Sequence, residues 1–179
     1  MIKPQESENR FKNDYRTIEQ TMEKFSGGTR RLAAQLTTSA SFDSLWNVLT
    51  DYDRLNLYIP NLLSSKKIYQ KNNNVQLKQV GAQDFLGMKF SAEVTIDLFE
   101  DKSLGLLKFN LIKGDFRKFE GSWKIQNIQN TSKNSLIYDL TVQGCQWMPI
   151  GMIEKRLKKD LSENLIAVDR QAKSSKKSF

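Results

Sequence analysis

Residues 148–173 read MPIGMIEKRLKKDLSENLIAVDRQAK, and this stretch decides the fold. Its apolar side chains recur every three or four positions, which on a helix places them in one stripe. The stripe consists of Ile150, Ile153, Leu157, Leu161, Leu165, Val168 and Ala172. Polar residues such as Lys155, Ser162 and Asp169 fall elsewhere on the helical wheel, where they can stay in water. The pattern predicts a long helix that needs an equally long apolar surface to lie on.

Alternating segments earlier in the chain supply such a surface. In residues 89–98 apolar side chains at every second position alternate with polar ones, which is typical of a half-buried strand. Similar segments begin near Arg30, Ser65, Val75, Leu107, Phe119 and Leu136. The asparagine-rich residues 71–74 separate two of them and predict an antiparallel hairpin. One apolar and one polar face indicates an antiparallel sheet that is covered on one side only.

A shorter helix is predicted at residues 42–53, where apolar residues repeat at helical spacing after the capping residue Ser41. Residues 55–63 contain Pro60 and no clear period, so we expect a loop or a broken helical turn there. The elements together predict an α+β fold in which a curved antiparallel sheet of about seven strands wraps around the long C-terminal helix.

The length of 179 residues fits a single domain, which we place at residues 29–172. Residues 1–28 are predicted to be a peripheral segment, either weakly helical or disordered, and residues 173–179 a basic tail. No apolar run is long enough to span a membrane, and the N-terminus lacks an apolar secretory signal. We therefore expect a cytoplasmic protein, with peripheral membrane contact as an open alternative.

The residue types that are missing exclude several kinds of chemistry. The chain has no histidine, and Cys145 is its only cysteine. An intramolecular disulfide, a thiolate metal cluster and every Ser/His or Cys/His nucleophile pair are therefore excluded. Asp160 and Glu163 share a helix face, but the sequence provides no second acidic cluster to complete a metal site. We expect no metal, no cofactor, and no hydrolase or redox activity.

The net charge of +8 favours anionic partners over cationic ones. An anionic membrane surface, nucleic acid or an acidic protein face would fit, and an ordinary solvated surface explains the charge equally well. The basic tail contains Lys173, Lys176 and Lys177 but no interleaved aromatic residues. Nucleic acid or the ribosome is therefore a less favoured partner than a membrane.

Several stretches together resemble a known family. They are LTDYDRLNLYIPNL at residues 49–62, LKQVGAQDFLGMKFSAEVTIDL at 77–98, GDFRKFEGSW at 114–123, LIYDLTV at 136–142 and LKKDLSENLIAV at 157–168. In collinear order they resemble the polyketide cyclase/dehydrase and lipid transport family of the START-like (SRPBCC) superfamily, in particular its coenzyme Q-binding-protein branch. The resemblance implies a helix-grip (START/Bet v 1-like) fold with an apolar cavity between the sheet and the terminal helix.

The resemblance also changes how the apolar residues are interpreted. By themselves they are more typical of a plain core than of a binding site. With the family's cavity, the expected ligand-binding wall is Phe90, Val94, Phe109, Trp123 and Tyr138 on the sheet with Met152, Ile153 and Leu157 on the helix. Tyr58, Ile59 and Pro60 would either cap the core or form the cavity mouth, where they could also touch a membrane.

These observations favour non-catalytic binding and transfer of a hydrophobic small molecule, such as an isoprenoid quinone, a lipid or a polyketide-like compound. One alternative is a metal-independent cyclase or dehydrase, with proton transfer by Tyr52, Arg117, Tyr138 or Asp139. It ranks second, because Asp139 should face the opposite side of the sheet from Tyr138. Another alternative is a ribosome-binding or protein-interaction module that uses the basic surface.

Overall fold

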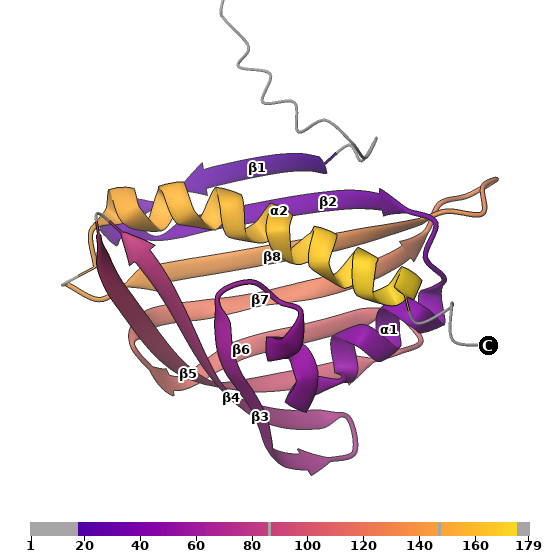
Figure 1. Ribbon diagram of the computed structural model, residues 1–179, viewed down its shortest axis with the longest axis horizontal. Coiled ribbons are helices and arrows are strands. Elements are labelled where there is room, and N and C mark those ends of the chain that lie inside the picture. Colours follow the sequence, from indigo (N-terminus) through magenta and orange to yellow (C-terminus); the bar gives the residue numbers. More distant parts are fainter. Residues whose placement is uncertain (1–17, 86, 147, 175–179) are drawn as a thin grey trace, which may run out of the picture.

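The computed structural model describes residues 18–85, 87–146 and 148–174. Within these ranges the chain forms one eight-stranded antiparallel sheet, two α-helices and two short 3₁₀ helices (Figure 1). The strands are β1 (Ile18–Lys24), β2 (Arg30–Thr38), β3 (Leu62–Lys71), β4 (Asn74–Phe85), β5 (Met88–Asp101), β6 (Leu106–Gly114), β7 (Phe116–Asn127) and β8 (Asn134–Gly144). The helices are η1 (Ser26–Gly28), α1 (Phe42–Thr50), η2 (Tyr52–Leu57) and α2 (Ile150–Ser174).

The sheet has the strand order β1-β2-β8-β7-β6-β5-β4-β3, so strands from the two ends of the chain, β2 and β8, lie next to each other. The sheet curls, and α2 crosses its inner face along β2 and β8 before it meets α1 (Figure 1). This is the curved sheet around a C-terminal helix that the sequence pattern predicted, and it is the helix-grip (START/Bet v 1-like) fold that the family resemblance implied.

The apolar stripe of α2 is buried, with Leu161, Leu165 and Val168 at most 1% exposed. Ile150 is the exception, because 45% of it is exposed. It is the first residue of the helix and lies over Gly28 rather than over the middle of the sheet. The prediction for Ile150 is therefore wrong, although the rest of the stripe packs as expected.

Asp169 is the clearest error on the polar side of the helix. It was expected in water but is completely buried. Its carboxylate accepts a hydrogen bond from the Thr38 hydroxyl and lies 3.0 Å from the Lys173 ammonium. A buried carboxylate needs such partners, and they come from β2 and from the next helical turn.

The N-terminal segment also differs from the prediction over residues 18–24, which form the strand β1 instead of a helix. The side chain of Gln20 reaches α2, where it donates hydrogen bonds to the Lys158 carbonyl oxygen at 2.8 Å and to the Ser162 hydroxyl. With this edge strand the sheet has eight strands, where the sequence predicted about seven. Residues 1–17 and 175–179 lie outside the described residues, so the peripheral N-terminal segment and the basic tail stay predictions there.

The other local predictions hold with small shifts. The hairpin at residues 71–74 joins β3 to β4, and Asn72 there has a positive φ of 52°, which asparagine tolerates. Ser41 caps α1 by accepting a hydrogen bond from the Ser44 amide. The segment after α1 is the predicted broken turn, because η2 gives way to an extended chain at Leu62. The helix at α1 ends at Thr50 instead of residue 53.

Candidate functional site

A cavity of about 300 Å³ lies between the curved sheet, α2 and the loop that joins η2 to β3. Its wall is mostly apolar and includes residues from β4 to β8 and from the first five turns of α2. Pro60, Asn61 and Ser91 on this wall are exposed, so the rim lies where the η2–β3 loop and the start of β5 approach α2. This volume is at the lower end of the range for small-molecule sites.

Every wall residue named from the sequence lies on this cavity: Phe90, Val94, Phe109, Trp123, Tyr138, Met152, Ile153 and Leu157. On the strands the inward positions alternate, which brings side chains from non-adjacent strands onto one face. Ile59 and Pro60 also lie on the wall, whereas Tyr58 does not. The Tyr58 hydroxyl donates a hydrogen bond to the Val48 carbonyl oxygen at 2.6 Å, and its ring packs on the main core. Tyr58 therefore caps the core.

Stacked aromatic rings form one side of the cavity. The ring centroids of Trp123 and Tyr138 lie 4.0 Å apart with an interplanar angle of 10°. Phe109 packs on Tyr138 and on Phe119 at centroid distances of 6.3 and 5.6 Å. Gly121 makes room for Phe109, because a Cβ atom there would collide with that ring and with a β8 carbonyl oxygen. Mutual packing fixes the orientation of these rings.

The helix side of the wall carries polar groups that the sequence reasoning did not assign to the site. Asp160 accepts a hydrogen bond from the Asn61 side chain at 3.4 Å and lies 3.7 Å from the Arg156 guanidinium. Asn164 lies one turn further along the same wall. Asp160 and Asn164 fall between Leu157 and Val168 at spacings of three and four, so the helical wheel did contain the signal.

The tyrosines of the wall are neutral at physiological pH. Burial raises the pKa of Tyr138, and the negative charge of Asp160 adds to this effect. Burial also raises the pKa of Tyr52, whose hydroxyl donates a hydrogen bond to the Glu100 carboxylate at 2.5 Å. Both groups are therefore phenols that can donate hydrogen bonds, and neither is available as a phenolate base.

Most of the chain that forms the sheet, the cavity and α2 matches one protein family. The sequence model of the family described as polyketide cyclase / dehydrase and lipid transport matches residues 38–169, from the end of β2 to the last turns of α2. The chain belongs to this family. Family and fold fit either hydrophobic-ligand binding or polyketide cyclase and aromatase chemistry. The narrower likeness to the coenzyme Q-binding branch stays a prediction.

Solved structures show the same fold. The STAR-related lipid transfer protein of Xanthomonas axonopodis superposes with a TM-score of 0.74 at 11% identity, covering 90% of this chain and 96% of that one. The Zhui aromatase/cyclase of a Streptomyces strain superposes with a TM-score of 0.67 at 15% identity, covering 81% of this chain and 94% of that one. A START superfamily protein of Mycobacterium smegmatis superposes with a TM-score of 0.66 at 17% identity, covering 80% of this chain and 97% of that one. Among curated proteins, no sequence matches the chain.

The structure separates the candidate proton-transfer residues of a cyclase. Tyr52 and Tyr138 lie on the cavity wall, but Arg117 and Asp139 do not. Arg117 is exposed, and Asp139 forms an ion pair with Arg31 at 2.7 Å on the outer face of the sheet, as predicted from the alternation. Among the residues that the structure describes, no group of three or more His, Cys, Asp or Glu side chains could hold a metal ion.

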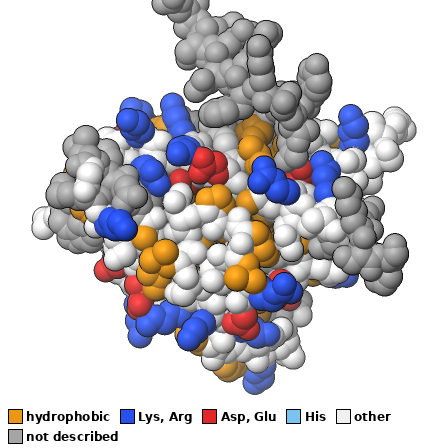
Figure 2. Space-filling view, in the orientation of Figure 1, with side chains coloured by type: hydrophobic (Ala, Val, Ile, Leu, Met, Phe, Trp, Pro, Cys, Tyr) orange, Lys and Arg blue, Asp and Glu red, His pale blue; other side chains and the backbone are white. Residues whose placement is uncertain are grey.

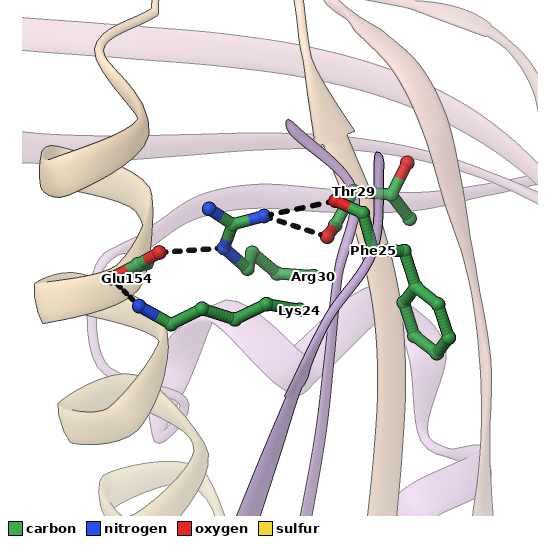
Figure 3. A network of polar contacts seen from close by, with 5 residues as sticks. All are labelled: Lys24, Phe25, Thr29, Arg30 and Glu154. Atoms are coloured by element: carbon green, nitrogen blue, oxygen red, sulfur yellow. Dashed lines mark hydrogen bonds and ion pairs between the residues drawn. The ribbon is translucent and has the colours of Figure 1, made fainter. Parts of the chain in front are cut away.

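A network of ionic contacts fixes the first turns of α2, which carry Met152 and Ile153 of the wall (Figure 3). The Arg30 Nε donates to the Glu154 carboxylate at 2.6 Å, and the Lys24 Nζ lies 3.1 Å from its other oxygen. Arg30 also donates to the carbonyl oxygen of Thr29 at 2.9 Å. The hydrogen bonds from Arg30 and Lys24 lower the pKa of Glu154. The start of α2 is thereby tied to β1, β2 and the turn between them.

Proposed function

We propose that the protein binds a hydrophobic small molecule in this cavity and carries it without chemical change. The observation that supports this most is the apolar cavity itself, because protein interiors are otherwise packed as densely as organic crystals. Burial contributes about 0.8 kcal/mol per methylene group. A tail of about ten methylenes therefore contributes on the order of 8 kcal/mol, which corresponds to a micromolar complex.

A fluorescent apolar probe tests this function. N-phenylnaphthylamine is neutral and brightens in an apolar site, so titration of the protein should give saturable binding. Ala92→Phe would place a ring inside the cavity, because Ala92 lies on its wall opposite Gly81 in the β4–β5 ladder. Ala33→Phe is the matched control, since Ala33 pairs with Asp139 on the outer face of the same sheet. We expect loss of probe binding only in Ala92→Phe; equal binding by both variants would refute the proposal.

Transfer of the ligand requires contact with a membrane, and we place this contact at the η2–β3 edge. Four exposed apolar residues lie there: Leu57, Leu63, Ile68 and Tyr69, each 48–68% exposed. β3 is an edge strand, and residues 62–73 contain Lys66, Lys67 and Lys71 but no acidic residue. Figure 2 shows basic and apolar side chains side by side at the lower end of the molecule, where the β3–β4 hairpin lies in Figure 1.

This edge suits weak, reversible contact with anionic lipid. Each lysine near such a surface contributes about 1 kcal/mol, and apolar side chains add to it by entering the headgroup region. Among the described residues, no helix has the length and the apolar composition to cross a bilayer. For Tyr58 the sequence left open whether it caps the core or lies at the cavity mouth. Its hydroxyl is hydrogen-bonded to the Val48 carbonyl oxygen, so the apolar residues that we propose to face the membrane are its neighbours.

A cyclase or dehydrase is the second candidate, because the neutral Tyr138 phenol lies on the cavity wall near the Arg156–Asp160 ion pair. Such a group could donate a proton to a developing enolate or alkoxide. Incubation with a linear poly-β-ketone thioester would test this function. Turnover that survives a chelator and is lost in Tyr138→Phe would favour the enzyme function over the carrier function. Absence of turnover by the unaltered protein would favour the carrier function.

A further inference from the structure

We propose that the cavity selects ligands whose head is a neutral hydroxyl group, an alcohol or a phenol, over a hydrocarbon or a carboxylate with the same apolar body. This inference rests on the proposed function, since it names the chemistry of the molecule that the same cavity would hold. What supports it is that two polar groups on the wall, one from Asn164 and one from Tyr138, make no hydrogen bond within the described part of the chain.

Asn164 is the first of these side chains. It lies on the cavity wall, and its Oδ1 atom is buried with no hydrogen-bond partner among the described residues. A buried acceptor without a partner is unfavourable, and such groups are uncommon in native proteins. The terminal torsion of an asparagine amide is soft, so a small rotation would turn the amide toward a bound molecule. A ligand hydroxyl could then donate the missing hydrogen bond.

Tyr138 is the second. It is 8% exposed, and within the described part of the chain its hydroxyl makes no hydrogen bond. Stacking on Trp123 at 4.0 Å holds the ring, so the position of the hydroxyl is fixed before a ligand arrives. A phenol both donates and accepts, which lets it hydrogen-bond to a ligand hydroxyl in either direction.

The charges of this wall decide against a carboxylate head. Asp160 and Arg156 lie 3.7 Å apart on neighbouring turns of α2, so the guanidinium already faces a carboxylate of the protein. Asp160 also influences Tyr138, since its negative charge helps to raise the pKa of that phenol. An anionic head at the Tyr138 hydroxyl would meet the same negative charge, whereas a neutral donor would be attracted to it.

Three ligands with one apolar body separate these possibilities: octylbenzene, para-octylphenol and para-octylbenzoate. Affinities can be measured at neutral pH by displacement of N-phenylnaphthylamine. We expect the phenol to bind about tenfold more tightly than the hydrocarbon, the effect of one added hydrogen bond in a buried site, and more tightly than the benzoate. Asn164→Leu and Tyr138→Phe should each lower the ratio of the phenol's affinity to that of octylbenzene several-fold, because each removes a hydrogen-bonding group from the wall.

Tyr58→Phe is the matched control, because the Tyr58 hydroxyl is bonded to Val48 and does not lie on the wall. It should keep the full preference for the phenol. Asn164→Ala provides a second variant should the leucine disturb packing, and circular dichroism verifies that each variant is folded. Equal affinity for phenol and hydrocarbon, or tightest binding of the benzoate, overturns the inference but leaves the proposed function standing. Absence of binding of all three by the unaltered protein overturns both.

Discussion

Two leucines one helical turn apart provide a test of the cavity through stability alone. Leu161 and Leu165 are both at most 1% exposed on the inner face of α2, but only Leu161 lies on the cavity wall. Leucine-to-alanine substitution removes three carbons, which costs about 2.4 kcal/mol of transfer free energy at about 0.8 kcal/mol each. The space that is left adds a further cost, so that packed sites lose about 2–5 kcal/mol in total.

The two sites should differ because the added cost depends on contacts that are lost. Leu165 is surrounded by packed core, so Leu165→Ala should lower the free energy of unfolding by about 4 kcal/mol. Leu161 already borders empty space and has fewer partner atoms on that side, so Leu161→Ala should cost about 2–3 kcal/mol. We therefore predict a difference of roughly 1–2 kcal/mol between two substitutions of the same chemistry.

Equilibrium unfolding in urea, followed by circular dichroism and tryptophan fluorescence, measures both values. The slope against denaturant should be equal for the two variants and the unaltered protein, which shows that the same surface is exposed on unfolding. If Leu161→Ala is as costly as Leu165→Ala or more so, no cavity lies beside Leu161, and the reasoning about the site fails with it.

Three further predictions concern other parts of the molecule. Leu63→Ser combined with Ile68→Ser should weaken sedimentation with phosphatidylglycerol vesicles at least tenfold without changing probe binding, and salt should weaken it as well; equal binding to phosphatidylcholine would contradict the membrane edge. Glu154→Gln should destabilise the protein at neutral pH. The folded-state pKa of Glu154 is lowered, so the difference should be full above the ordinary glutamate pKa of about 4.3, shrink as the pH falls below it, and vanish only below the lowered folded-state value. A difference that does not change with pH would exclude the ionic role. Gly121→Ala should cost several kcal/mol because its methyl group meets backbone, whereas Gly151→Ala, with open space around it in α2, should stabilise by about 0.5–1 kcal/mol; similar melting temperatures for both would refute this.

The parts of the fold that sequence could predict are those that depend on periodicity. Alternation in β5 and the three-to-four spacing in α2 determine which face of each element is apolar, and a single-sided sheet with one long amphipathic helix has few ways to pack. For the same reason periodicity could place Phe90, Val94 and Leu157 on the inner face of their elements, where the cavity lies. That packing leaves a void between them is a property of the tertiary arrangement, and only the family resemblance indicated it.

The errors come from interactions between segments that are distant in sequence. Asp169 has an ordinary polar position on the wheel, and its burial depends on Thr38 of β2. Residues 18–24 are compatible with either helix or strand, and pairing with β2 decides the outcome. For Tyr58 the sequence left two positions open, core cap or cavity mouth, and a hydrogen bond to Val48 decides between them. Local preference is overridden in each case by a partner that the sequence does not specify.

Native mass spectrometry of the protein after gentle purification, with lipid extraction of the same sample, tests most directly whether the cavity holds a hydrophobic molecule. We predict that part of the protein carries one small apolar molecule per chain and that the same molecule appears in the extract. The adduct should be absent from Ala92→Phe, which fills the cavity, and present in the control Ala33→Phe. A protein that is free of adduct after purification and stays so when incubated with para-octylphenol and octylbenzene, or an adduct that Ala92→Phe retains in full, would contradict the account.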